Sequence, residues 1–93
     1  MSKKTILVVD DTPVNVDILT GFLGGTYNIK SAGNGVRALE AAQRNPPHLI
    51  LLDIMMPEMD GYEACRRFKT NPDTSETPII FITAKTGRED IVK

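Results

Sequence analysis

The sequence predicts an α/β domain built on a parallel sheet with helices on both of its faces. Two short segments, 5–9 and 49–52, are apolar runs of the kind found in central parallel strands that are buried on both sides. Segments with helical spacing alternate with the predicted strands, which favours right-handed crossovers. Aspartates follow both runs, at the carboxyl ends where open α/β sheets build their sites.

The first helix is predicted to follow the strand over 5–9 directly. Thr12 is expected to cap this helix and Pro13 to begin it, because proline is favoured at the first helical position. The spacing of Val14, Ile18 and Phe22 predicts one apolar face, with Leu19 and Leu23 beside it. The pair Gly24-Gly25 then ends the helix.

The remaining elements continue the alternation, with no internal repeat and no domain linker. Asp60 is a candidate cap for the helix that follows the second apolar run. The chain ends within a pattern that resembles the beginning of a fourth helix. The predicted strands are 27–32, 49–52 and 79–83, the predicted helices are 36–44 and 62–69, and the helix that begins at the end of the chain covers 88–93.

Length and composition predict one small domain of 93 residues with a net charge of −1, which gives no sign of nucleic-acid binding. The single cysteine, Cys65, cannot form an internal disulfide, so a reducing compartment is expected. The first apolar run is too short for a signal peptide, and no segment is long enough to span a membrane. We therefore expect a cytoplasmic domain. Arg66-Arg67 is interpreted as a solvated helix face and His48 as an exposed loop residue.

Three aspartates, Asp10, Asp11 and Asp53, are the candidate site. If the two central strands are neighbours, the three carboxylates converge, and two charges ~4 Å apart repel by ~4 kcal/mol at an effective dielectric of ~20. Such a cluster needs a proton or a cation, and carboxylate oxygens suit Mg²⁺. The alternative for each residue taken singly is a turn aspartate that caps a helix.

The segments that flank this cluster add weaker signals. The main-chain carbonyl of Met55, two residues after Asp53, is placed to point at a metal, whereas Met56 and Met59 are expected to pack in or beside the core. Thr83 ends the last strand, where a hydroxyl can reach an anion held over the sheet. The alternative for Thr83 is a β-branched residue that favours strand structure.

Three segments together resemble the receiver domain of two-component response regulators, the CheY-like family: 6–11 (ILVVDD), 51–61 (LLDIMMPEMDG) and 78–84 (PIIFITA). The resemblance covers the whole chain and implies a flavodoxin-like sheet of strand order 2-1-3-4-5. It implies that Asp53 accepts a phosphoryl group from the phosphohistidine of a sensor histidine kinase. Asp10 and Asp11 would hold Mg²⁺ together with Asp53 and the Met55 carbonyl, and Thr83 with Ala84 would sense the phosphoryl group.

The chain departs from this family at its end. Family members continue through a fourth helix, a fifth strand that ends in a phosphoryl-binding lysine, and a fifth helix. Lys85 and Lys93 match other positions, so no catalytic lysine is assigned. We therefore expect an incomplete receiver domain over 1–93, with four strands and the start of a fourth helix. Its Ile79–Thr83 strand would be an exposed edge, through which chains self-associate or exchange elements.

Three functions are compatible with these observations. The first is a phosphoacceptor receiver, a signalling module that assists its own modification rather than a metabolic enzyme. By resemblance, Val14, Asn15 and the rest of the first helix would contribute to a kinase-docking face. The second is a truncated receiver that only self-associates. The third, a Mg²⁺-dependent phosphatase, is disfavoured because Met55 occupies the position of its second acid. Neither the cognate kinase nor the output is specified.

Overall fold

The computed structural model describes residues 3–56 and 58–82, and its elements alternate in the predicted order. The predicted functional residues Thr83 and Ala84, and the helix expected from residue 88, lie outside the described residues. The strands are β1 (Thr5–Val9), β2 (Asn28–Ala32), β3 (Leu49–Asp53) and β4 (Ile79–Ile82), and the helices are α1 (Pro13–Leu23), α2 (Gly35–Arg44) and α3 (Gly61–Thr70). Each observed boundary lies within one residue of the predicted one.

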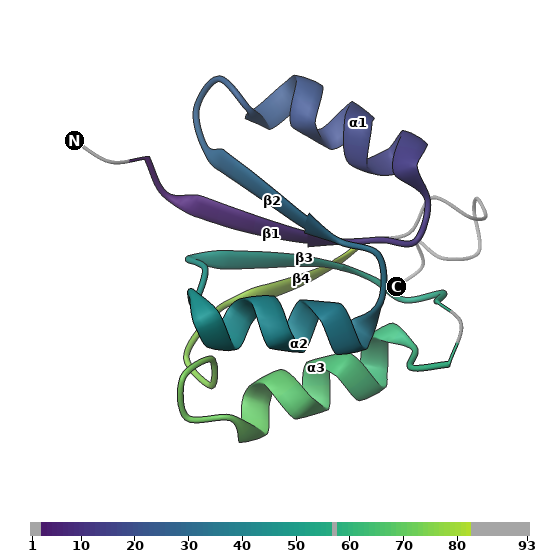
Figure 1. Cartoon of the computed structure of the whole chain (residues 1–93), viewed down its shortest axis with the longest axis vertical. Helices are drawn as coiled ribbons and strands as arrows, with labels where there is room; N and C mark the ends of the chain where they lie inside the picture. Colours follow the sequence, from purple (N-terminus) through teal and green to yellow (C-terminus); the bar gives the residue numbers. More distant parts are fainter. Residues whose placement is uncertain (1–2, 57, 83–93) are drawn as a thin grey trace.

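The four described strands form one parallel sheet of order β2-β1-β3-β4, which matches the part of the expected order that these residues cover. Helix α1 lies on one face of the sheet, and α2 and α3 lie side by side on the other (Figure 1). The prediction of helices on both faces is thus confirmed. No helix among the described residues has the length and apolar character needed to cross a membrane.

Two hydrophobic clusters, one on each face, explain why the central strands are apolar throughout. Leu7 and Val9 of β1 belong to the cluster under α2 and α3, whereas Ile6 and Val8 belong to the cluster under α1. Successive side chains of a strand point to opposite faces, so a strand covered on both sides needs apolar residues at every position. The larger cluster also contains Phe68 of α3, which is completely buried.

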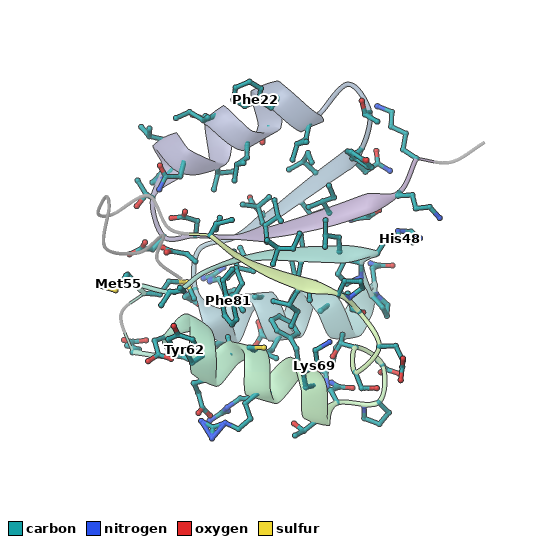
Figure 2. All side chains as sticks on the ribbon, turned by 180° about the vertical axis from the view of Figure 1, so that it is seen from behind. Phe22, His48, Met55, Tyr62, Lys69 and Phe81 are labelled. Carbon is teal, nitrogen blue, oxygen red and sulfur yellow. The ribbon has the colours of Figure 1, made fainter. Side chains whose placement is uncertain are left out.

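Helix α1 packs on the sheet with a different side from the one predicted. Val16, Leu19 and Leu23 contact the sheet cluster. The exposed fractions of Val14, Ile18 and Phe22 are 62%, 53% and 80%, so the predicted apolar face points outward, as the position of Phe22 shows (Figure 2). The helix carries apolar residues around much of its circumference, and hydrophobic spacing alone therefore did not identify the buried side.

Asp60 and Thr12 are the N-cap residues of α3 and α1, as predicted, but only Asp60 caps through its side chain. Asp60 accepts a hydrogen bond from the Glu63 N–H at 2.9 Å, and Asn34 caps α2 by accepting from the Arg37 N–H at 2.8 Å. Thr12 precedes Pro13 as expected, but its side chain makes no capping hydrogen bond. Instead, its main-chain carbonyl accepts from the N–H groups of residues 15 and 16.

The outer surface of α3 is charged, as predicted for Arg66-Arg67. Both arginines pair with Glu63 one turn earlier, and their side chains stay largely exposed. The hydrogen bond from Arg67, assisted by the charge of Arg66, lowers the pKa of Glu63. Surface pairs of this kind contribute little to stability, and the exposure of both arginines agrees with the predicted solvated helix face.

The connection from α3 to β4 is held to α3 by hydrogen bonds in both directions. Lys69 Nζ donates to the main-chain carbonyls of Thr77 at 2.7 Å and Ser75 at 3.3 Å, and the buried Thr74 hydroxyl donates to the Phe68 carbonyl at 2.6 Å. Within β4, Phe81 stacks at a tilt on Tyr62 of α3, with ring centroids 5.3 Å apart (Figure 2). These contacts fix where β4 begins and which face Phe81 covers.

Gly61 provides a test of how closely α3 must approach β3. A Cβ atom at this position would lie 2.4 Å from the Asp53 main-chain oxygen and 2.7 Å from Ile54 Cα, neither of which can yield easily. We expect Gly61→Ala to lower the free energy of unfolding by about 2–3 kcal/mol, as overpacking does. Urea unfolding followed by circular dichroism measures this change.

Gly21→Ala is the matched control, because nothing lies within 4 Å of its added Cβ on the exposed side of α1. There the substitution should stabilise the helix by about 0.5–1 kcal/mol. Equal effects of the two substitutions would show that the contact between Gly61 and the Asp53 backbone is not tight.

Candidate functional site

The three candidate aspartates meet at the carboxyl ends of β1 and β3. Asp53 is the last residue of β3, and Asp10 and Asp11 follow β1. Because Val9 pairs with Leu52, the next residues, Asp10 and Asp53, come alongside one another. One carboxylate oxygen from each of the three residues lies within 4.8 Å of the others. The sequence-based prediction that these residues converge is therefore correct in its geometry.

The Asp10 carboxylate is buried and is held at both oxygens. Oδ1 accepts a hydrogen bond from the Thr12 N–H at 2.9 Å, and Oδ2 accepts one from Asn15 Nδ2 at 3.1 Å. The Asp10 N–H donates to the Ala32 carbonyl at 3.1 Å, which extends the β1–β2 pairing by one residue. Main chain and side chain are thus both fixed, whereas Asp11 is exposed.

Asp53 is also buried, with 1% of its surface exposed. Its Oδ1 accepts a hydrogen bond from the Met55 N–H at 3.1 Å, and the Gly61 N–H donates to the Ile54 carbonyl at 2.9 Å. The loop after β3 therefore turns back tightly and orients the Asp53 side chain. Glu58, with φ of 68°, adopts the left-handed conformation within this turn.

The methionines of this loop divide as the sequence predicts. Met56 is buried in the core and Met59 packs against it, directly over Gly35 at the start of α2. Met55 is 54% exposed and lies at the rim of the sheet near the acidic cluster (Figure 2). The predicted role of the Met55 carbonyl stays a prediction, since the observed contact of this residue is through its N–H.

The electrostatics of the cluster favour a cation. Two carboxylates 4.8 Å apart repel by about 3 kcal/mol at an effective dielectric of ~20. Mg²⁺ binds oxygen ligands at about 2.0–2.1 Å and usually keeps several waters, so an ion held directly by one or two of these carboxylates can reach the third through a water. The donor set therefore fits Mg²⁺. Asp10, Asp11 and Asp53 are the only group of three or more potential metal ligands in the described part of the chain.

Asn15 is the site residue that reasoning from motifs missed. It was considered only as part of a docking face, yet its amide reaches the buried Asp10 carboxylate. An asparagine in the first turn of a helix, five residues after a strand-end aspartate, was the available signal. His48 is exposed as predicted, but its Nδ1 accepts a hydrogen bond from the Thr5 N–H at 2.9 Å, which ties β3 to β1 far from the site.

The fold and the acidic pocket define a class of small α/β signalling domains, and comparison with known proteins agrees. The model of the response regulator receiver domain family matches residues 6–93. The chain belongs to this family, and it is therefore a two-component receiver domain.

Among characterised relatives, the chain is 47% identical over 90 residues to a probable cyclic di-GMP phosphodiesterase of Vibrio cholerae, covering 97% of this chain and 20% of that protein. It is 45% identical over 89 residues to the response regulator PleD of Caulobacter vibrioides, covering 95% of this chain and 20% of that protein. The chain thus spans about a fifth of the length of these curated relatives.

Solved structures show the same fold. The receiver domain of a sensor histidine kinase from Pseudomonas aeruginosa PAO1 superposes with a TM-score of 0.85 at 31% identity, covering 96% of this chain and 74% of that one. That domain holds a magnesium ion in its active-site cleft. The N-terminal domain of a response regulator receiver protein from Methanoculleus marisnigri JR1 gives 0.85 at 46% identity, with coverages of 96% and 73%.

Proposed function

We propose that this receiver domain accepts a phosphoryl group on Asp53 from the phosphohistidine of a sensor histidine kinase, with Mg²⁺ held at the same pocket. The observation that supports this best is the placement of three carboxylates within 4.8 Å at neighbouring strand ends, two of them buried. A fold gains nothing from such repulsion unless a charged ligand uses the site. The domain acts in this proposal as a signalling module rather than a metabolic enzyme.

In the proposed transfer, a carboxylate oxygen of Asp53 attacks the phosphorus atom of phosphohistidine. The new O–P bond forms as the N–P bond breaks, and the imidazole nitrogen leaves with the electron pair and takes up a proton. Catalysis of phosphoryl transfer consists mainly of positioning and charge stabilisation. The Met55 N–H orients the attacking carboxylate, and the short turn to Gly61 holds it in place.

The other roles in the proposal follow the resemblance. Mg²⁺, when bound, would neutralise negative charge on the incoming phosphoryl group. Asp10, Asp11, Asp53 and the Met55 carbonyl would hold it. Thr83 and Ala84, beyond the described residues, would respond to the phosphoryl group, and no catalytic lysine is assigned. A location in the cytoplasm stays a prediction. The downstream response would depend on the protein or domain to which this receiver is coupled.

Phosphorylation of Asp53 is tested with a small phosphodonor. After incubation with acetyl phosphate, we expect intact-mass analysis to show one added phosphoryl group with Mg²⁺ and almost none with EDTA. Asp53→Asn should abolish the addition, because the amide is not a competent nucleophile. Asp73→Asn, the same change on an exposed loop, is the control and should react like the unmodified chain. Addition to Asp53→Asn, or to none of the folded samples, would contradict the proposal.

The kinase is proposed to dock on the outward face of α1, defined by Val14, Ile18 and Phe22. A phosphohistidine must come within bonding distance of Asp53, so its carrier must contact the loops at the carboxyl ends of the strands. Helix α1 begins at this edge, two residues after Asp11. Its three exposed apolar side chains form a stripe of the kind that marks a protein interface.

Ile18→Asp tests this docking face. With a histidine kinase that phosphorylates the unmodified chain, we expect the initial transfer rate to fall at least about tenfold, equivalent to ~1.4 kcal/mol of binding. The rate with acetyl phosphate should not change. Val36→Asp is the control, because Val36 is equally exposed, at 52%, but lies on α2 across the sheet. Equal loss in both variants, or loss with acetyl phosphate as well, would argue against docking on α1.

We also propose that chains associate through β4. Among the described residues, β4 pairs with β3 alone, and Ile80 and Phe81 are 51% and 38% exposed. A strand edge with unpaired main-chain groups and exposed apolar side chains is a template for pairing with another chain. Exchange of elements between chains is the alternative form of the same association.

Ile80→Lys tests association through this edge. A charged residue on an edge strand opposes pairing between strands, so we expect the molar mass measured by light scattering at micromolar concentration to fall to that of one chain. Val36→Lys, a matched change on α2, should leave the mass of the assembly unaltered. A single-chain mass for the unmodified protein would refute the association.

A further inference from the structure

We infer that Asn15 is a positioning residue that fixes the Asp10 carboxylate in the orientation needed to bind Mg²⁺. The inference rests on the proposed function of the acidic cluster. The proposed metal ligands are the three aspartates and the Met55 carbonyl, and Asn15 is added as a residue that orients one of these ligands without binding the metal. Asn15 lies in the first turn of α1, and its Nδ2 donates to Asp10 Oδ2 at 3.1 Å.

The contact is placed where it can control orientation. The Asp10 main chain is fixed by its hydrogen bond to Ala32, and Oδ1 is fixed by the Thr12 N–H. Without Asn15, the carboxylate would still be tied at one oxygen but could rotate about that bond. The Asn15 amide supplies the second attachment, so the plane of the carboxylate is set by a helix rather than by solvent.

The chemistry of the donor matters as much as its place. An amide is neutral, so it orients Asp10 without cancelling the charge that attracts the cation. A lysine or arginine in reach of Asp10 would form an ion pair and compete with the metal. Asn15 itself is anchored, because its own N–H donates to the Thr12 carbonyl at 3.0 Å. One short segment, Asp10 to Asn15, thus contains both the proposed ligands and the group that orients one of them.

Asp11 shows the contrast within the same segment. It is exposed, and its side chain accepts a long hydrogen bond of 3.4 Å from the neighbouring Thr12 hydroxyl. We therefore assign Asp10 the preorganised carboxylate of the pair and Asp11 the adaptable one. Hydrogen-bond partners of metal ligands typically change metal affinity by 10–100-fold when they are removed.

The test measures Mg²⁺ affinity directly, from the dependence of the thermal unfolding midpoint on Mg²⁺ concentration and from calorimetric titration. We expect Asn15→Ala to raise the Mg²⁺ dissociation constant about tenfold. Its unfolding midpoint in EDTA should change little, because alanine favours the helix and offsets the lost hydrogen bond. Asn15→Gln, which retains an amide, should recover part of the affinity. Gln43→Ala, which removes an exposed amide from helix α2, is the control and should bind Mg²⁺ like the unmodified chain.

Phosphorylation by acetyl phosphate provides a second readout. The rate of Asn15→Ala should be reduced at low Mg²⁺ and restored at saturating Mg²⁺, a split that a merely structural role would not produce. Unchanged Mg²⁺ affinity in Asn15→Ala, or equal losses in Gln43→Ala, would overturn the inference and leave the proposed function standing. Absence of Mg²⁺ binding by the unmodified chain would overturn both.

Discussion

The parallel pairing of β1 with β3 is the constraint on which the rest of the structure depends. Its register places Val9 opposite Leu52, so that Asp10 arrives beside Asp53. The same register sends alternate side chains into two separate hydrophobic clusters. A slip of one residue would exchange the faces of a whole strand and move the carboxylates apart. The packing that stabilises the sheet therefore also assembles the acidic pocket, and a change in the register of β1 against β3 would disrupt both.

Repulsion between the carboxylates of the acidic pocket lowers the stability of the fold that brings them together. Burial of Asp10 and Asp53 removes water from two like charges, and Asp11 adds a third within 4.8 Å. The fold limits this cost with neutral donors, namely the N–H groups of Thr12 and Met55 and the amide of Asn15. The two donors to Asp10 carry no positive charge, so they orient this carboxylate without cancelling the charge that would attract a cation.

Much of this arrangement could be predicted from the sequence, because the governing signals are local or periodic. Continuous apolar runs identified β1 and β3, and Asp60 was correctly predicted as the cap of α3. The inward side of α1 could not be predicted, since apolar residues surround much of that helix. The role of Asn15 was missed as well, because an asparagine near a helix start is a weak signal until a buried carboxylate is seen within reach of it. Both failures concern side-chain direction, which depends on tertiary contacts rather than on spacing.

These two features of α1 belong to a single rotation of the helix about its axis. In the observed rotation of the helix, Asn15 reaches Asp10 while Val16, Leu19 and Leu23 contact the sheet. This rotation leaves Val14, Ile18 and Phe22 in solvent, although burial of side chains of this size typically contributes about 1.5–3 kcal/mol each. A helix selected for stability alone would carry polar residues there. The apolar stripe starts beside the acidic pocket, so a protein bound along α1 would also reach Asp53, as the proposed docking requires.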